Sequence, residues 1–537
     1  MPKFDINYFE IPVYNNSSDN CISKLYNLTN IQYYNPIYKT LFDINNENLN
    51  NISLNHQYHF IENNLVFNNK NKQFINKNTF FKFSPIYDPL HYLIGKFKNY
   101  ENFYQLPLYN EPLDCNKYIY NYNNSSYIDN FFCFINSIVL NNHNFINALD
   151  YYGSIMALQT NFKLDIADDV DYLINSNFFT KNINTLYTLD NNKINSYIRL
   201  NTSKKIKKPI NISDQICFDF DIIELPNVHN NKTPKYINNI ENISEFNINN
   251  NNNDNIINVR KNSESDDSEN DDSESDDSES DDSKSDECIN IYIKKYPIQA
   301  ICMEKCVNTL DFLLETSSLS SHEGICCLFQ IIMTLLCFQK CFHFTHNDLH
   351  TNNVMYIETE EEYIYYKYNN KYFKVPTYGK IFKIIDYGRA IYKFNGTTYC
   401  SNNFAPGGSA YTQYNCEPYF NPNKKRIEPN YSFDLCRLGC SIYDFIIDID
   451  DDKNTFNDLQ HVIDLWCKDD YGKNILYKKN GQERYSDFKI YKMIARTVNQ
   501  HTPEMQLQLP YFKTFEVQKN SFTSNNIIDI DDIPIYV

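Results

Sequence analysis

The stretch Phe344-Thr-His-Asn-Asp-Leu-His-Thr-Asn-Asn-Val-Met355 places an acid, Asp348, five residues before an amide, Asn353. A second stretch, Ile384-Ile-Asp-Tyr-Gly-Arg389, follows it and carries another acid, Asp386, after two isoleucines. Apolar residues lie before and after the first stretch. The pattern predicts a loop between apolar elements, and then a buried strand that ends in an acid and a glycine turn.

Two acids and an amide at the ends of strands can hold a divalent metal ion and orient a hydroxyl group. Phosphoryl transfer to an alcohol needs this set, because its catalysis consists mostly of positioning and charge neutralisation. A solvated loop beside a strand-end acid would use the same residue types. The combined spacing of Asp348, Asn353 and Asp386 favours the chemical interpretation.

The composition predicts a large globular protein that does not bind nucleic acid. The 537 residues are 42% hydrophobic and 16% aromatic, and they are numerous enough for two or more large cores. The net charge of −18 arises mainly from residues 263–287, whose 14 acids and one lysine leave only −5 on the rest of the chain. No basic face is concentrated anywhere, so the footprint of a nucleic-acid binder is missing.

The cysteines and apolar runs predict an intracellular protein without a membrane partner. The 16 cysteines are scattered through apolar runs and form no paired C-x-x-C motifs, which indicates buried free thiols and no zinc site. The first residues contain no apolar signal core. The longest apolar run, Ile325–Phe338, is too short to span a bilayer and predicts a buried helix.

Residue periodicity predicts the elements around the two stretches. A strand at 79–85 sets Lys82 on the face opposite its phenylalanines, although an exposed strand lysine would look the same. Residues 125–141 repeat apolar residues with helical spacing, and Asp129 lies in the first turn. Further expected elements are a strand at 149–158, two short strands within 290–306, a tyrosine-rich hairpin at 358–380, and helices at 165–179, 309–314, 322–341, 431–447 and over most of the tail to 516.

Four motifs resemble those of protein kinases, and they follow one another along the chain in the order found in that family. His346 to Asn353 matches the catalytic loop H-x-D-x-x-x-x-N, and Asp386-Tyr-Gly388 matches D-F-G with an exchanged aromatic residue. Asp434-Leu-Cys-Arg-Leu-Gly439 resembles the D-x-x-x-x-G that opens the central helix of the kinase C-lobe. Met303-Glu-Lys-Cys306 resembles the hinge between the two lobes.

In detail the chain resembles the predicted serine/threonine protein kinases of giant DNA viruses that infect amoebae. The stretches Lys82-Phe-Ser-Pro-Ile-Tyr-Asp-Pro, Tyr151-Tyr-Gly-Ser and Lys383-Ile-Ile-Asp-Tyr-Gly-Arg-Ala carry this resemblance. It covers residues 290–500 well and 79–180 loosely. The resemblance implies a viral protein that acts on host or viral protein substrates, in the host cytoplasm or packaged in the virion.

The resemblance implies an α+β, bilobal protein-kinase-like fold, with a small mixed N-lobe that contains insertions and a mainly helical C-lobe. The expected order is an Asn-rich segment in or on the N-lobe (1–78), the N-lobe (79–227), a disordered Ser/Asp/Glu-rich insert (228–288), the last N-lobe strands and hinge (289–306), the C-lobe (307–516) and a loose tail (517–537). The composition of the insert by itself predicts disorder.

The resemblance also implies a role for each motif residue. Asp348 would accept or steer the proton of the substrate hydroxyl. Asn353 and Asp386 would hold magnesium that bridges the phosphates of ATP. Lys82 would reach the α- and β-phosphates, and Asp129 would hold Lys82 in place.

The remaining roles concern adenine and the support of the loop. Backbone groups of Glu304 and Cys306 would bind adenine, with Met303 behind it. His350 would contact the γ-phosphate. His346 and Asp434 would support the catalytic loop, with Asp434 holding its backbone from below.

Several positions depart from the kinase pattern and leave two alternatives open. No glycine occurs before Gly95, so the Gly-rich loop expected before Lys82 is absent. Asn347 replaces the arginine of H-R-D, and His350 replaces a lysine, as in kinases resembling choline and aminoglycoside phosphotransferases. Beside an ATP- and magnesium-dependent serine/threonine kinase, the alternatives are a pseudokinase that acts as an interaction scaffold and a small-molecule kinase.

Overall fold

This computed structural model describes residues 21–41, 43–49, 57–100, 102–110, 117–189, 289–448, 452–486, 488–519 and 526–537. The chain divides into two units, one of residues 1–192 with 288–537 and the other of residues 193–287. The second unit and the predicted disordered insert at 228–288 lie outside the described residues. The first unit is mixed α+β, as the sequence predicted.

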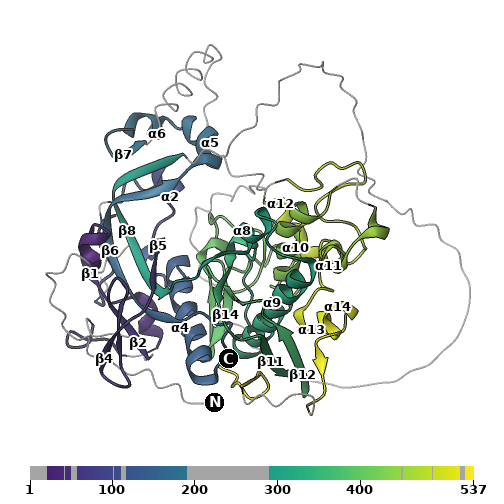
Figure 1. The fold of residues 1–537 in the computed structure, drawn as a ribbon. Coiled ribbons are helices and arrows are strands. Elements are labelled where there is room, and N and C mark those ends of the chain that lie inside the picture. The colour runs from purple at the N-terminus through teal and green to yellow at the C-terminus, as the bar shows by residue number, and fades with distance from the viewer. Residues whose placement is uncertain are drawn as a thin grey trace, which may run out of the picture. The chain divides into compact units, whose positions relative to one another are not determined.

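A five-stranded antiparallel sheet forms the N-terminal part of the first unit (Figure 1). Its strands follow the order β1 (Leu28–Gln32), β6 (Tyr151–Asp165), β8 (Asn290–Glu304) and β5 (Thr79–Pro85), and β7 (Tyr187–Leu189) pairs with β8. The expected two short strands at 290–306 are wrong, because β8 is a single strand of 15 residues. Continuous pairing with β6 carries it through the polar residues in its middle.

The predicted helix at 165–179 is also only partly right. Strand β6 extends to Asp165, and two short helices follow, α5 (Val170–Ile174) and α6 (Asn177–Asn182). Ser176 separates them, because its side chain accepts a hydrogen bond from Phe179 N–H and so caps a new helix. The short helices α1 (Ile22–Leu25), α2 (Pro89–Leu93) and α3 (Lys117–Tyr120) complete this part.

Helix α4 (Ser125–His143) confirms the helix predicted at 125–141. It begins where the Asn124 side chain accepts a hydrogen bond from Ser126 N–H, and it ends at Asn144 in the left-handed conformation. The sequence suggested one apolar stripe, yet every residue from Ser126 to Val139 is buried. The reason is that the sheet lies on one side of α4 and the helices of the C-terminal part lie on the other (Figure 1).

A separate three-stranded sheet contains β2 (Tyr58–Glu62), β3 (Leu65–Asn68) and β4 (Gln73–Asn76). It does not continue the larger sheet beyond β5. Instead it packs on it, with the rings of Phe60 and Phe81 5.5 Å apart. Gly153 permits this close approach, since its φ is +122° and a Cβ there would lie 3.0 Å from the His59 ring.

The C-terminal part surrounds the long helix α9 (Ser321–Phe342). Ser320 and Glu323 form a capping box at its start. The expectation that this apolar segment is too short for a bilayer is wrong, because the complete helix is long and apolar enough to cross one. It is nevertheless a core helix, since 94% of its most apolar window is buried. The other helices are α8 (Leu310–Glu315), α10 (Phe433–Ile446), α11 (Asp458–Trp466), α12 (Lys489–Thr497), α13 (Pro503–Gln506) and α14 (Pro510–Lys513).

Short strands connect these helices. Antiparallel pairing joins β10 (Val354–Glu358) to β13 (Lys380–Ile384) and to β9 (Asn308–Thr309). The predicted tyrosine-rich hairpin is confirmed as β11 (Tyr363–Tyr368) and β12 (Lys371–Pro376). A second hairpin consists of β14 (Ile391–Phe394) and β15 (Thr397–Cys400), and β16 (Glu516–Val517) pairs with β12. Every cysteine in the described residues is free, as expected, and all but Cys21 are buried.

The expected loose tail at 517–537 is wrong for residues 526–537. Strand β17 (Ile527–Asp529) pairs in parallel with β11. The Lys340 ammonium donates hydrogen bonds to the carbonyl oxygens of Ile530 and Asp531, at 2.5 and 2.6 Å. Ile530 is fully buried. The tail is polar in composition, but the alternating residues Ile528 and Ile530 are buried in the core.

We expect Ile530→Ala to lower the free energy of unfolding by about 2–4 kcal/mol, because it leaves a cavity in a packed core. Ile535, which is 54% exposed, supplies the matched control. Ile535→Ala should change the free energy by about 0.5 kcal/mol or less. Urea denaturation followed by the fluorescence of the single, buried Trp466 measures both. Equal effects of the two variants would contradict a packed tail.

Candidate active site

The loop at 346–353 is held by a buried carboxylate. Asp434, in the first turn of α10, accepts hydrogen bonds from the backbone N–H groups of His346 and Asn347, both at 2.8 Å. Burial raises the pKa of Asp434, and His346 together with these N–H donors opposes that rise. The His346 ring in turn lies 2.9 Å from Ile385 O. The structure therefore places His346 and Asp434 where the sequence predicted support of the loop.

Asn347 is a structural tie in this loop. Its φ is +65°, in the left-handed region, which asparagine tolerates better than most residues. Its side-chain amide donates to Thr345 O and Arg389 O, and its carbonyl oxygen accepts from the Tyr414 hydroxyl at 2.8 Å. Asparagine at this position thus joins three segments with neutral hydrogen bonds.

Lys82 contacts two carboxylates from different elements. Its Nζ lies 2.5 Å from Asp129 Oδ2 on α4 and 2.8 Å from Asp386 Oδ1 after β13. The other oxygen of Asp129 accepts a hydrogen bond from Tyr387 N–H at 2.9 Å. The interpretation of Lys82 as an exposed strand lysine is therefore wrong. The Lys82–Asp129 contact forms although Asp129 occupies a position where the kinase pattern usually has the longer glutamate.

Lys82, Asp129 and Asp386 form the Lys82 trio, and the charge that they share sets the protonation state of each. Burial favours a neutral Lys82 amine, but the two carboxylates raise the pKa of Lys82, so the group is an ammonium ion. Burial raises the pKa of Asp129, whose side chain is only 2% exposed, and Lys82 opposes the rise. Burial also opposes ionisation of Asp386, yet the Lys82 charge lowers the pKa of Asp386 to about 2. Asp386 is therefore ionised throughout the neutral range.

Asn353 and Asp386 lie at the same end of one antiparallel ladder. Val354 pairs with Ile384, and Ile385 N–H donates to Asn353 O at 2.9 Å. The Asn353 amide nitrogen donates to Asp348 O at 2.9 Å, which leaves its carbonyl oxygen as the atom able to meet a metal ion. An amide oxygen and an ionised carboxylate are the donors magnesium prefers, so the pair fits that ion.

The metal site expected here is a partial one. The residues that the structure describes contain no group of three or more His, Cys, Asp or Glu side chains able to hold a metal. Magnesium at a phosphoryl-transfer site keeps waters and phosphate oxygens among its ligands and needs only one or two carboxylates. Asp386 with Asn353 meets that smaller requirement.

His350 does not supply a positive charge. Burial lowers the pKa of His350, and Asp348 only partly opposes this. Its Nε2 lies 3.1 Å from the Asn353 amide nitrogen, and a donor at that position needs the lone pair of a neutral ring. At neutral pH His350 therefore differs in charge from the lysine it replaces.

Among the described residues, the expected hinge has two occupied amides and, between them, no partner for Cys306 N–H. Lys305 N–H donates to Asn78 O and Val307 N–H donates to Tyr356 O, with Cys306 between them. Glu304 N–H donates to Asp150 O, so of the Glu304 backbone groups expected to bind adenine the N–H is already occupied. Met303, directly before this turn, is 5% exposed.

Sequence reasoning missed Lys383 in this region. Lys383 is a buried lysine on β13, and its Nζ lies 2.5 Å from Glu304 Oε1. It also donates to Ala148 O at 2.7 Å. The ion pair fastens the hinge to the strand that leads into Asp386. A lysine inside the apolar run before D-Y-G was the available signal.

Sequence reasoning also missed the partners of Asp348. The Tyr491 hydroxyl donates to Asp348 Oδ1 at 2.8 Å, and Arg389 Nη1 lies 3.3 Å from the same oxygen. Arg389 directly follows the D-Y-G motif, so a charged residue at a fixed distance from Asp386 was visible. Tyr491 lies on α12, far along the chain, and no local pattern connects it to Asp348.

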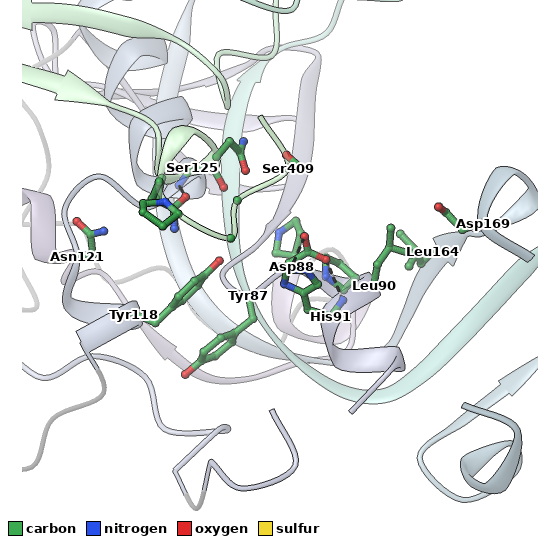
Figure 2. A pocket seen from close by; sticks show the side chains of 18 of the residues that line it. Tyr87, Asp88, Leu90, His91, Tyr118, Asn121, Ser125, Leu164, Asp169 and Ser409 are labelled. Atoms are coloured by element: carbon green, nitrogen blue, oxygen red, sulfur yellow. Dashed lines mark hydrogen bonds and ion pairs between the residues drawn. The ribbon is translucent and has the colours of Figure 1, made fainter. Parts of the chain in front are cut away.

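A cavity of about 450 Å³ lies beside the start of α4 (Figure 2). Pro85 and residues 87–91 line it, as do residues 402–403 and 405–409, and Tyr118 and Ser125 contribute to its wall. Its lining includes none of the residues of the Lys82 trio. The candidate active site is therefore defined by polar contacts and not by this cavity.

A scan against protein-family models and a search of the curated proteins found no match for this chain. The resemblance to kinases consequently depends on the four motifs and on the contacts that join them. Those contacts bring Lys82, Asp129 and Asp386 together, and they join Asp348 to Asn353.

We expect Lys82→Met to destabilise the protein by about 2–4 kcal/mol at pH 7.5, because it leaves the buried Asp129 without its cation. The more exposed Asp386 contributes less, since water screens its charge. Without Lys82 the pKa of Asp129 should rise further above its unfolded value. The native state then binds the extra proton, so the stability of the variant should fall as the pH rises from 5 to 7.5.

Thermal unfolding of wild type and variant at several pH values measures this effect. Lys371→Met is the control, because Lys371 pairs with Glu516 at 2.8 Å on the surface. Its loss should stay below about 1 kcal/mol. A Lys82→Met loss that is equally small, or that does not grow with pH, would show that Asp129 needs no cation.

Proposed function

We propose that the protein is a serine/threonine protein kinase that uses ATP and magnesium, on a bilobal kinase-like fold. The observation that carries the proposal is the double contact of Lys82 with Asp129 and Asp386. One strand, one helix and one loop supply these residues. A motif assigned Asp386 to the site, the resemblance of the stretch around Lys82 assigned the lysine, and the position of Asp129 on the predicted helix made it the candidate partner.

Each residue has a defined part in the proposed transfer. The Lys82 ammonium neutralises the α- and β-phosphates, and Asn353 with Asp386 holds magnesium, which supplies charge neutralisation at the phosphates. Asp348 orients the acceptor hydroxyl. The hydroxyl oxygen forms a bond to the γ-phosphorus as the bond from that phosphorus to the bridging oxygen breaks. ADP leaves, and the hydroxyl proton passes to Asp348.

The arrangement of the first unit supports the bilobal part of the proposal. The five-stranded sheet and α4 precede a short connection at residues 305–307, and the helices around α9 follow it. Asp434 holds the catalytic loop from within α10, which corresponds to the central helix of the kinase C-lobe. Sheet, connection and helical part thus follow the order of the kinase fold.

One observation favours a pseudokinase as the second candidate. Strands β2 to β4 form their own sheet and do not extend the larger sheet past β5, where kinases place the strands of the phosphate cover. The chain also has no glycine before Gly95, so the loop expected to cover the ATP phosphates has no glycine to make its backbone flexible. The occupied carboxylate of Asp348 is compatible with both candidates, because a substrate can displace the Tyr491 hydroxyl. A small-molecule kinase has less support. Its main argument is the histidine at position 350, and burial lowers the pKa of His350, so the ring brings no positive charge to the γ-phosphate that it was expected to contact.

We expect the full-length chain to transfer phosphate from magnesium-ATP to generic protein substrates, and Asp348→Asn to reduce the rate about 100- to 10,000-fold. Asp386→Asn should abolish magnesium-dependent transfer. Asp458→Asn, which changes an exposed acid on α11, should leave the rate unchanged. Radiolabel transfer followed by phosphoamino-acid analysis measures the rate and the acceptor residue.

The outcomes separate the candidates. Wild-type transfer no faster than that of Asp348→Asn, with no binding of ATP, would refute the enzyme. Binding of ATP without transfer to any protein or small alcohol would identify a pseudokinase. Transfer to choline or an aminoglycoside, and not to protein, would identify the small-molecule kinase.

A further inference from the structure

The acceptor side of Asp348 is occupied by a hydroxyl of the chain itself. Tyr491 O–H donates to Asp348 Oδ1 at 2.8 Å, which is the contact an incoming acceptor hydroxyl must make with a general base. Tyr491 lies on α12, and its ring stacks on Phe488 with centroids 5.3 Å apart. Tyr491 therefore marks where an acceptor side chain has to sit.

Two guanidinium groups flank this position. The Arg437 guanidinium lies 5.1 Å from the centre of the Tyr491 ring, and that of Arg389 lies 5.6 Å from it. Arg389 also reaches Asp348. Two cations around one aromatic ring, with a single carboxylate between them, leave excess positive charge at the acceptor position.

The Arg437 side chain interacts with that of Tyr491 and keeps one donor unused. Its Nε is buried and has no hydrogen-bond partner within the part of the chain that the structure describes. Within that part no carboxylate lies within 4.0 Å of its guanidinium. A half-buried guanidinium is suited to a carboxylate or phosphate, both of which match its planar fork.

The other charged groups of the site are already engaged. Asp386 pairs with Lys82, and Asp434 is occupied by the backbone of the catalytic loop. Asp311 accepts the hydroxyl of Thr351. None of these three acids pairs with Arg437, whose charge interacts instead with the Tyr491 side chain and with Asp348 at the acceptor position.

We propose that Arg389 and Arg437 are specificity-determining residues that select acceptor hydroxyls flanked by an anionic group, with Tyr491 holding the acceptor position until the substrate displaces it. The inference rests on the proposed kinase function and names its substrate class. An acidic side chain or a phosphorylated residue next to the acceptor would take over the guanidinium contacts that the Tyr491 ring gives up. Peptides with neutral neighbours would displace the tyrosine without that compensation.

Three serine peptides of one length test the inference on the full-length protein. The first carries aspartate and glutamate around the acceptor, the second carries asparagine and glutamine instead, and the third carries one phosphoserine beside the acceptor. We expect kcat/KM for the acidic peptide to exceed that for the neutral one by about tenfold or more, as charge-assisted contacts imply. The phosphoserine peptide distinguishes phosphate from carboxylate as the better ligand.

Arginine variants assign the preference to the two residues. Arg437→Gln and Arg389→Gln should each reduce the ratio between acidic and neutral peptides toward one, and Arg437→Lys should retain part of it. Arg426→Gln is the matched control, because Arg426 is exposed and pairs with Glu428. If the half-buried Arg437 is required for folding, Arg389→Gln still tests the inference. A ratio unchanged in both glutamine variants, or a wild type that prefers the neutral peptide, would overturn the inference.

A binding measurement separates this inference from the kinase proposal. Fluorescence anisotropy with labelled acidic and neutral peptides requires no transfer. Transfer with equal use of both peptides would refute the inference and leave the kinase standing. Absence of transfer with about tenfold tighter binding of the acidic peptide, lost in Arg437→Gln, would refute the kinase and retain the anionic site. Absence of both would refute both.

Tyr491→Phe isolates the occupying hydroxyl. The substitution keeps the ring between the guanidinium groups and removes the donor to Asp348. We expect KM for the acidic peptide to fall about three- to tenfold at unchanged kcat, because the substrate no longer competes with a hydrogen bond of this strength. Tyr471→Phe, at a tyrosine that is 80% exposed, is the control. A fall in kcat would instead show that the hydroxyl assists the transfer, which overturns its role as a displaced group.

Discussion

The Lys82 ammonium between Asp129 and Asp386 is the interaction on which the proposed site depends. It joins the edge strand of the sheet to α4 and to the turn after β13. Two carboxylates share one cation. Burial raises the pKa of the deeply buried Asp129, whereas the Lys82 charge lowers the pKa of the more exposed Asp386. The same contact orders Tyr387, whose N–H donates to Asp129. The strand, the helix and the acid after β13 thus have one fixed relation.

A second fixed point lies beneath the catalytic loop. The buried Asp434 holds two consecutive N–H groups of the loop, and α10 holds Asp434. Aromatic packing links the loop to α4, since the rings of Phe132 and Phe344 stack with centroids 4.3 Å apart. The segment that carries Asp348 is therefore held by hydrogen bonds to Asp434 and by apolar contacts, and the Asp348 side chain itself is held by Arg389 and Tyr491. This support does not need the charged residue that kinases usually have at 347.

Charge at the site is redistributed relative to the kinase pattern. Asparagine and a neutral histidine occupy two positions where positive charge is usual, and two arginines supply that charge on the acceptor side instead. Lys383 adds a buried cation behind the hinge, where it pairs with Glu304. Under the proposed kinase function, positive charge therefore lies on the acceptor side of the loop and not on the phosphate side. A preference for anionic acceptors follows from that shift.

The sequence by itself determined the elements whose signals are local. Motif spacing located Asp348, Asn353 and Asp386, and periodicity located α4 and α9, because a helix or a loop shows its pattern within a few turns. The pairing of Lys383 with Glu304, the packing of the tail on β11 and the contact of Tyr491 with Asp348 were decided only by the tertiary structure. Each joins residues far apart in the chain, and the burial and charge that create such contacts exist only once the core has formed.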